Sequence, residues 1–200
     1  MKELVLCTRN QHKIIELKEL LRALFLSLKS LDDFPPFPKP PENGQTFEEN
    51  ATSKALHSSL ALKRWCLADD SGLEVEALGG KPGILSARYA ETNPERIARL
   101  LKELEDVPLS KRIARFVCAM SLSDPEGNVV VRTGYCYGTI ANEPRGTNGF
   151  GYDPVFYIPQ LGRTMAELSL DEKNHISHRA KAARQLIPII EKVVDKTVGE

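Results

Sequence analysis

The sequence predicts an α/β protein, because strand-like and helix-like patterns alternate along the chain. The apolar run at 4–7 is typical of a buried strand, and apolar residues at helical spacing follow it over 14–24. A capping box at Thr46 begins a second helix that reaches about Lys63, and a short strand at 66–68 follows. The chain therefore opens as strand, loop and helix.

A β-hairpin is predicted in the second half of the chain. The segments 113–123 and 129–140 alternate in the manner of paired strands, and turn-forming residues at 124–128 join them.

Three further helical segments are predicted from their caps. Asn93 with Pro94 begins a helix that ends near Leu104, and a short capped segment spans 164–167. A closing helix begins at Ser177 with an apolar inner face.

Composition and charge exclude several classes of protein. The 200 residues include 27 Lys and Arg against 27 Asp and Glu, which gives a formal net charge of zero. This balance argues against nucleic acid or an anionic membrane as a partner, so any phosphate binding should be local. No apolar run approaches the roughly 18 residues of a membrane span, and no repeat marks a second domain. A single domain over 1–200 is expected.

The cysteines indicate a reducing compartment. Cys7, Cys66, Cys118 and Cys136 stand apart in apolar or strand-like context, without the C-x-x-C spacing of zinc sites. We therefore expect four buried thiols in a cytoplasmic protein, since the N-terminal apolar run is also too short for a signal segment.

The first loop is a candidate phosphate site. Its sequence Thr8-Arg9-Asn10-Gln11-His12-Lys13 connects the first strand to the first helix. A helix N-terminus presents backbone donors to an anion, and the Lys13 side chain would add charge. The alternative is a solvated capping loop.

Two adjacent carboxylates, Asp69 and Asp70, are candidate catalytic groups. Neighbours on a regular strand point to opposite faces, so both serve one site only if the chain leaves the strand there, as the following Ser-Gly pair permits. Converging carboxylates, helped by Glu42 or Glu49, would hold Mg2+ while one of them orients or deprotonates a water. The alternative is a turn with solvated charges.

The most distinctive loop is Gly146-Thr147-Asn148-Gly149-Phe150-Gly151-Tyr152-Asp153-Pro154. Its glycines let backbone N–H groups approach a ligand, and Phe150 offers a ring face on which a base can stack. The loop can therefore hold a flat ring, and the alternative is a turn with Phe150 in the core.

Cationic side chains elsewhere could complete a site for a phosphorylated ligand. Lys13, Lys54 and Lys173 stand near glycine loops or helix starts and could neutralise a polyphosphate, although a single lysine is most often a surface residue. His178 and Arg179 could donate to a carbonyl or phosphate oxygen.

Together these motifs resemble those of the inosine triphosphate pyrophosphatase family, which acts on non-canonical purine nucleoside triphosphates. The similarity runs nearly end to end and keeps the family's motif order. It is carried by Thr8, Asn10 and Lys13, Glu49-Asn50-Ala51 with Lys54, Ala68-Asp69-Asp70-Ser71-Gly72-Leu73, Ser86-Ala87-Arg88-Tyr89, Gly149-Phe150-Gly151-Tyr152-Asp153-Pro154, Glu172-Lys173 and Ile176-Ser177-His178-Arg179.

The resemblance implies an elongated mixed α/β fold with a central sheet, flanking helices and two lobes around an active-site cleft, usually as a homodimer. It also implies Mg2+-dependent hydrolysis of ITP, dITP or XTP between the α and β phosphates, which gives the monophosphate and pyrophosphate.

Site residues are implied by the same resemblance. Asp70 would be the general base and a metal ligand, and Glu42 the other metal carboxylate. Asn50, Lys54 and Asp69 would support them. The substrate site would comprise Thr8, Arg9, Asn10, Gln11, His12, Lys13, Ser71, Phe150, Gly151, Tyr152, Asp153, Lys173, His178 and Arg179. Donors such as His178 and Arg179 would favour the 6-oxo group of hypoxanthine or xanthine over the 6-amino group of adenine.

Arg9 departs from the resemblance, because the family places glycine at this position. If the position requires a positive φ, Arg9 would be strained; otherwise it would add a phosphate contact. Two alternatives to an active enzyme follow: a nucleotide-binding or sensing module that lost turnover through Arg9, and a protein-interaction domain that uses the proline-rich segment 35–41.

Overall fold

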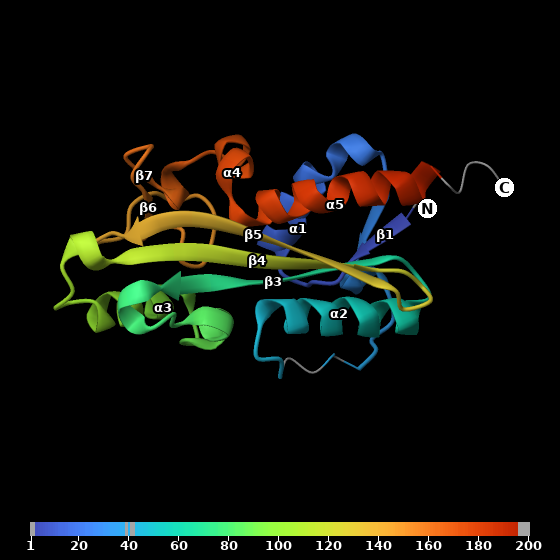
Figure 1. The fold of residues 1–200 in the computed structure, drawn as a ribbon, viewed down its shortest axis with the longest axis horizontal. Helices are drawn as coiled ribbons and strands as arrows, with labels where there is room; N and C mark the ends of the chain where they lie inside the picture. Colours follow the sequence, from blue (N-terminus) through green and yellow to red (C-terminus); the bar gives the residue numbers. More distant parts are fainter. Residues whose placement is uncertain (1–2, 39, 41–42, 196–200) are drawn as a thin grey trace. The chain divides into compact units, whose positions relative to one another are not determined.

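A mixed β-sheet organises the fold, which the computed structural model describes for residues 3–38, 40 and 43–195 (Figure 1). Within these residues, seven strands form one sheet in the order β2-β1-β3-β4-β5-β6-β7. The strands are β1 (Glu3–Leu6), β2 (Ser27–Ser30), β3 (Cys66–Val75), β4 (Ile113–Ser123), β5 (Val129–Ile140), β6 (Phe156–Ile158) and β7 (Arg163–Thr164). The α-helices are α1 (Gln11–Leu20), α2 (Phe47–Leu62), α3 (Asn93–Glu103), α4 (Leu170–Ile176) and α5 (His178–Asp195). The predicted α/β class with a mixed central sheet is confirmed.

The chain divides into two compact units. Unit 1 is formed by the described residues within 1–70, 118–134 and 179–200, and unit 2 by 71–117 and 135–178. In neither unit does a described helix combine the length and apolarity needed to cross a membrane.

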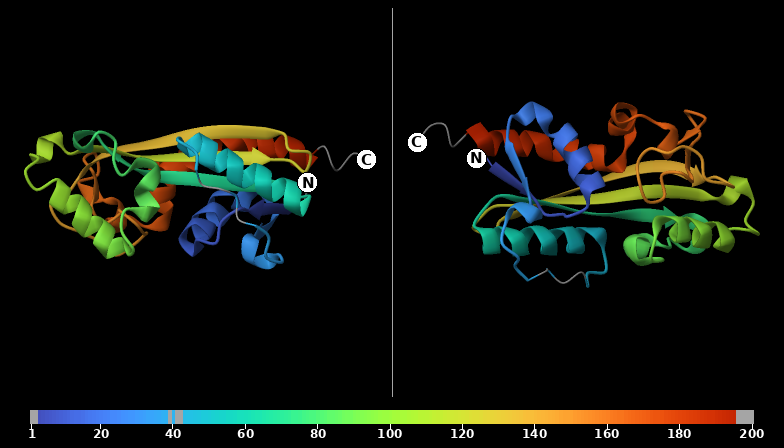
Figure 2. Two further views of the ribbon diagram at one scale, coloured as in Figure 1. Left: turned by 90° about the horizontal axis from the view of Figure 1, so that it is seen from below. Right: turned by 180° about the vertical axis from the view of Figure 1, so that it is seen from behind.

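Alternation along β1 builds two apolar layers in unit 1. Leu4 and Leu6 join a cluster with residues of α1 and α5, whereas Val5 and Cys7 join a second cluster with α2. Successive strand residues face opposite sides, so α1 and α5 cover one face of the sheet in this unit and α2 covers the other. The first and last helices, blue and red in Figure 2, lie side by side.

β3 is longer than predicted, and the expectation that the chain leaves the strand after its two aspartates was wrong. The strand runs from Cys66 to Val75 without leaving the sheet after its two aspartates. Leu67 belongs to the α1 and α5 layer and Ala68 to the α2 layer, so Asp69 and Asp70 continue the alternation. The two carboxylates therefore diverge, because sheet pairing outweighs the turn tendency of the Ser-Gly pair that follows them.

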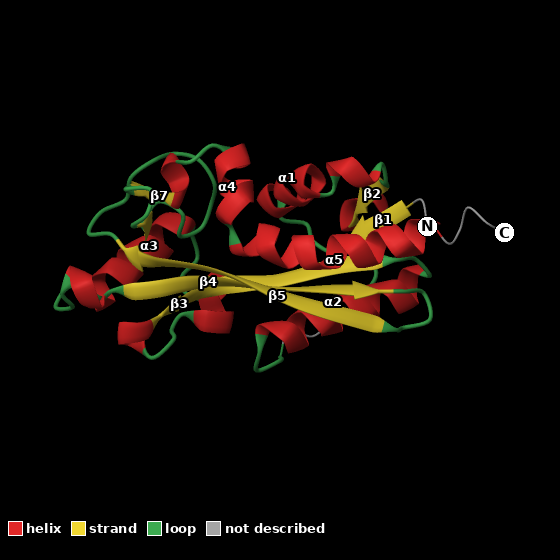
Figure 3. Cartoon of the chain, turned by 45° about the horizontal axis from the view of Figure 1, so that its top comes forward, coloured by secondary structure: helices red, strands yellow, loops and turns green. Residues whose placement is uncertain are grey.

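The predicted hairpin is confirmed with its bounds. β4 and β5 are the long paired strands of Figure 3, and their connection begins at Asp124. The Asp124 carboxylate accepts hydrogen bonds from the backbone N–H groups of Glu126 and Asn128 at 3.0 and 2.8 Å. This side-chain turn fixes the register of the strands that leave it.

The cap of α2 agrees with the sequence, and that of α3 corrects it by one residue. Thr46 Oγ1 accepts from the Glu49 N–H at 3.1 Å, as expected for the start of α2. The cap of α3 is Thr92 rather than Asn93, since Thr92 and Glu95 form the reciprocal capping box.

A short helix, α4, was not anticipated. Its capping box of Ser169 and Glu172 stands in the sequence as the usual S-x-x-E signal, which could have revealed it. The closing helix is confirmed, with Ala180, Ala183 and Ile190 buried on its inner face.

The core of unit 2 packs α3 against strand residues and the loop after β5. The centre of the Phe116 ring lies 4.3 Å from that of Phe156 and 4.8 Å from that of His178. The buried members are Leu73, Val75, Tyr89, Ile97, Leu100, Leu104, Ala114, Phe116, Cys136, Ile140, Tyr152, Val155, Phe156, Ile158, Met165 and Leu168.

All four cysteines are buried thiols outside any disulfide, as predicted. Burial and the neighbouring Asp69 carboxylate raise the pKa of the Cys118 thiol, so it stays protonated.

Candidate functional site

The first loop is held by its own side chains. Asn10 Oδ1 accepts from the N–H groups of His12 and Lys13 at 3.0 and 3.3 Å, and the Asn10 N–H donates to Thr8 Oγ1 at 3.1 Å. Two of the first donors of α1 are therefore engaged by the cap, which corrects the expectation that they are offered to a phosphate. The capping-loop alternative describes this part of the backbone.

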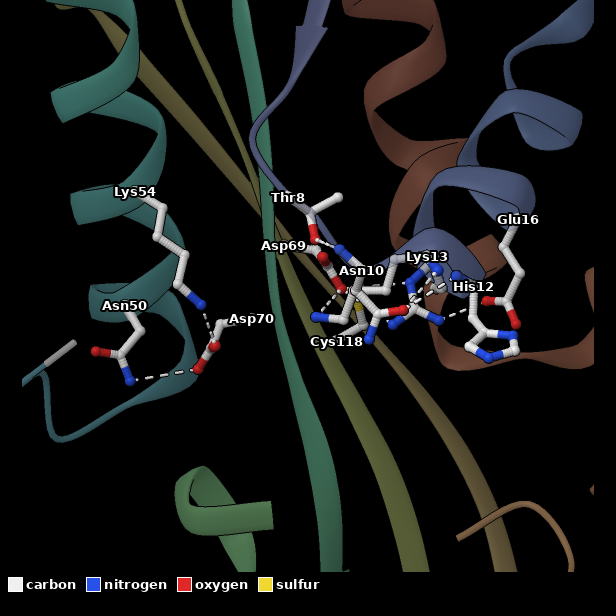
Figure 4. A network of polar contacts seen from close by, with 11 residues as sticks. Thr8, Asn10, His12, Lys13, Glu16, Asn50, Lys54, Asp69, Asp70 and Cys118 are labelled. Carbon is white, nitrogen blue, oxygen red and sulfur yellow. Dashed lines mark hydrogen bonds and ion pairs between the residues drawn. The ribbon is translucent and has the colours of Figure 1, made fainter. Parts of the chain in front are cut away.

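Lys13 instead reaches a buried carboxylate. Its Nζ lies 3.0 Å from Asp69 Oδ2, and the Asp69 side chain is fully buried. On the same face, the Arg179 guanidinium bonds Asp69 Oδ2 through Nη2 at 3.0 Å and Glu16 through Nη1 at 2.5 Å. Figure 4 shows Asp69 turned toward the α1 residues Lys13 and Glu16.

This buried network pairs two carboxylates with two cationic side chains. Burial opposes ionisation of Asp69, but Lys13 and Arg179 together hold its pKa below the ordinary value. Burial likewise opposes the charge on Arg179, and Asp69 with Glu16 raises its pKa. Two carboxylates and two cations balance, so removal of one member would leave an uncompensated buried charge.

The position of Arg179 does not fit its predicted role as a donor to a purine base. It is 1% exposed, and the donors predicted for a purine base are bonded to Glu16 and Asp69. Sequence reasoning missed Glu16, whose only signal is a carboxylate among the inward residues Ile14 and Leu17 of α1.

Asp70 faces α2 on the opposite side of β3. Lys54 Nζ lies 2.7 Å from its Oδ1, and the Asn50 amide donates to its Oδ2 at 3.3 Å (Figure 4). Burial raises the pKa of Asp70, and Lys54 opposes that change. With its side chain 16% exposed, Asp70 keeps part of its carboxylate accessible.

The donor set at Asp70 suits a hard cation only in part. Among the described residues, no group of three or more His, Cys, Asp and Glu side chains is placed to hold a metal ion. The predicted second carboxylate, Glu42, lies outside the described residues. Mg2+ is commonly bound by one or two carboxylates plus substrate phosphates, and the accessible oxygens of Asp70 fit that mode.

The glycine-rich loop of unit 2 is built around Asp153. Its Oδ2 accepts from the Phe150 N–H at 2.8 Å and from Lys173 Nζ at 2.5 Å. Lys173 Nζ in turn lies 5.1 Å from the centre of the Phe150 ring. Gly149 has a φ of +73°, and a Cβ there would overlap the Asp153 carboxylate. Phe150 is half-buried, so it presents part of its ring, and the alternative that places it in the core is not supported.

Other predicted substrate residues of unit 2 lie deeper. Tyr152 is 4% exposed and its hydroxyl donates to the Ser86 carbonyl at 2.9 Å, so it belongs to the core rather than to a ligand surface. His178 is 5% exposed and stacks on Phe116. Ser71 is half-buried in β3, and Gly151 has a φ of +63° that suits glycine.

Arg9 is not strained. The described non-glycine residues with positive φ are Phe25 and Lys63, so the strain alternative for Arg9 is wrong. Its guanidinium lies 3.4 Å from Asp32, with both side chains about half exposed. Gln11 and His12 are exposed beside it.

Lysine side chains held beside carboxylates on an α/β sheet, as here, can stabilise the negative charge of a phosphate compound. The chain belongs to the Ham1 family, whose profile matches residues 4–189. This finding confirms the resemblance drawn from the motifs.

Relatives and solved structures agree with this assignment. A protein from Geobacillus kaustophilus named dITP/XTP pyrophosphatase is 50% identical over 197 residues, which cover 97% of both chains. A Bacillus cereus protein of the same name is 47% identical over 205 residues and covers 100% of this chain and 98% of that protein. The Ham1 protein of Staphylococcus aureus has the same fold, with a TM-score of 0.85, 42% identity and coverage of 96% of this chain and 99% of that one.

Proposed function

We propose that this protein hydrolyses non-canonical purine nucleoside triphosphates such as dITP, ITP and XTP to the monophosphate and pyrophosphate. The observation that carries the proposal is Asp70, an accessible carboxylate of raised pKa held by Lys54 and Asn50 in a Ham1-family chain. Full-length relatives at 47–50% identity are named for this activity, so a sensing module without turnover is not favoured.

Asp70 would act as the general base. Part of its carboxylate is accessible to an attacking water, and its two bonded neighbours limit the directions in which the carboxylate can turn. Lys54 and Lys13 would stabilise negative charge that develops on the phosphates.

Asp70, with Glu42 outside the described residues, would hold Mg2+ together with substrate phosphates. The cation would supply Lewis-acid stabilisation of the phosphoryl oxygens. The chain's own residues would hold Asp70 in place, through Asn50 and Lys54, beside the cation.

The loop of Gly149 to Asp153 would hold the purine ring. The half-buried Phe150 offers a stacking face, and Asp153 fixes that loop through the Phe150 N–H and Lys173. Arg179 would act indirectly, because it holds the Asp69 carboxylate that Lys13 contacts.

Partners and location are also part of the proposal. The small-molecule substrate accounts for the site without nucleic acid or a membrane, and the zero net charge agrees with this. We expect a homodimer, as the resemblance implies, and a cytoplasmic location, which four buried thiols outside any disulfide support.

The test is a panel of nucleoside triphosphates assayed for pyrophosphate release with and without Mg2+. We expect dITP, ITP and XTP to be hydrolysed far faster than dATP and dGTP, and only with the metal. Equal turnover of all purine nucleotides, or none, would remove the proposal.

A further inference from the structure

Asn50 ties the candidate general base to the segment that precedes α2. The residue is 2% exposed, in the first turn of that helix. Its Oδ1 accepts from the Gly44 backbone N–H at 2.9 Å, and its Nδ2 donates to Asp70 Oδ2 at 3.3 Å. One side chain therefore bridges two parts of unit 1 that are far apart in sequence.

The bridge has a fixed direction. A backbone N–H can only donate, so the Gly44 contact requires the amide oxygen of Asn50 and leaves the amide nitrogen toward Asp70. Asn50 is thus held as a donor to Asp70 by a backbone group that cannot change its role.

Asp70 receives complementary contacts from the two neighbours. Lys54 engages Oδ1 with a charge at 2.7 Å, and Asn50 engages Oδ2 with a neutral donor. Lys54 alone would still allow the carboxylate to rotate about its bond to Cβ, whereas two partners on different oxygens fix its plane. Gly44 leaves room for this arrangement, since a Cβ there would lie 2.7 Å from Asn50 Oδ1 and 2.8 Å from Glu49 Cβ.

We infer that Asn50 is a positioning residue that sets the orientation of the Asp70 carboxylate, and that Gly44 holds the Asn50 amide in place. This inference rests on the proposed role of Asp70. A general base displaced by about 1 Å or less transfers protons more slowly, whereas substrate contacts made elsewhere are not weakened.

Asn50→Ala should lower kcat for dITP about 10- to 100-fold with KM within about threefold of wild type, the usual range for misplacement of a reacting group. Titration calorimetry with an α,β-methylene analogue of dITP should give the wild-type number of sites, which shows that the loss is not unfolding. Ser58→Ala is the matched control, because Ser58 is also a buried polar residue of α2. It should keep wild-type kcat.

Gly44→Ala tests the same bridge without changing residue 50. It should lower kcat in the same way, and in the Asn50→Ala background it should add much less than it costs alone. A kcat within twofold of wild type for Asn50→Ala, a KM that rises in step with the loss, or fully additive effects would overturn the inference.

A crystal structure of Asn50→Ala gives a readout that needs no turnover. An Asp70 carboxylate turned away from its wild-type rotamer supports the inference, and an unmoved carboxylate overturns it. If wild-type protein releases no pyrophosphate, the proposed function fails separately, and this structural comparison still decides the role of Asn50.

Discussion

Asp69 and Asp70 are adjacent in β3, yet their carboxylates bind different lysines on opposite faces of the sheet. Asp69 Oδ2 lies 3.0 Å from Lys13 Nζ, and Asp70 Oδ1 lies 2.7 Å from Lys54 Nζ. The Asp69 side chain is fully buried in an ion network, whereas that of Asp70 is 16% exposed. Asp69 therefore anchors Lys13 in the buried network, whereas Asp70 keeps part of its carboxylate exposed beside Lys54.

Asp70→Asn should lower kcat about 100-fold or more while the chain still folds, because the amide keeps the shape of the side chain and loses its basicity. Steady-state kinetics with dITP, together with a thermal unfolding curve, would measure both. Asp106→Asn, at an exposed position, should leave kcat unchanged. Wild-type turnover of Asp70→Asn would remove Asp70 from the mechanism.

Lys13→Ala should reduce kcat/KM by about 10-fold or more, since its charge would serve both the bound triphosphate and the transition state. The variant should also unfold at lower temperature, because Asp69 loses a cation in a buried setting. Lys18→Ala, at an exposed position of the same helix, is the control. An unchanged kcat/KM would show that Lys13 does not meet the substrate.

Gly149→Ala should raise KM for dITP strongly, because the new Cβ needs a left-handed backbone and overlaps the Asp153 carboxylate that fixes the Phe150 loop. Gly151→Ala separates the two effects. Gly151 lies in the same loop and also has a positive φ, +63°, but a Cβ there meets nothing within 4 Å. If the two variants have the same KM, backbone strain alone explains the result.

Arg9→Gly should change KM by no more than about tenfold. The Arg9 side chain pairs with Asp32 at 3.4 Å in an exposed position, and exposed ion pairs contribute little free energy. Kinetics of both proteins with ITP and XTP would measure this. Inactive wild-type protein and an active glycine variant would instead favour the sensing module.

Tyr89 should make stability depend on pH in the alkaline range. Burial and a hydrogen bond to Glu103 raise the pKa of Tyr89 from 10.0 to about 12. The folded state then binds a proton that the unfolded state has lost, so this contribution to stability is complete below pH 10 and is lost between about pH 10 and 12. Urea unfolding across this range should show the decline for wild type and a smaller one for Tyr89→Phe. Tyr137 is 61% exposed, so the stability of Tyr137→Phe should decline with pH as that of wild type does.

Local patterns in the sequence were enough to predict the helices and strands and the kinds of group available for chemistry. Apolar periodicity and capping boxes place the hairpin strands 113–123 and 129–140 and the start of α2, because these signals depend on residues close together in the chain. The motif set also identified the family that the Ham1 profile confirms.

The contacts of those groups depend on segments that are distant in the chain. Asp69 and Asp70 diverge because β3 continues in the sheet, a consequence of pairing with strands that are remote in sequence. Arg179 and Glu16 lie in one buried network although 163 positions separate them in the chain, and no local pattern encodes such a pairing. Tyr152 belongs to the core for the same reason, since its hydroxyl finds the Ser86 carbonyl only when the chain has folded. Neighbours along the chain set helix and strand, whereas burial and charge pairing between distant segments set the orientation of each candidate site residue.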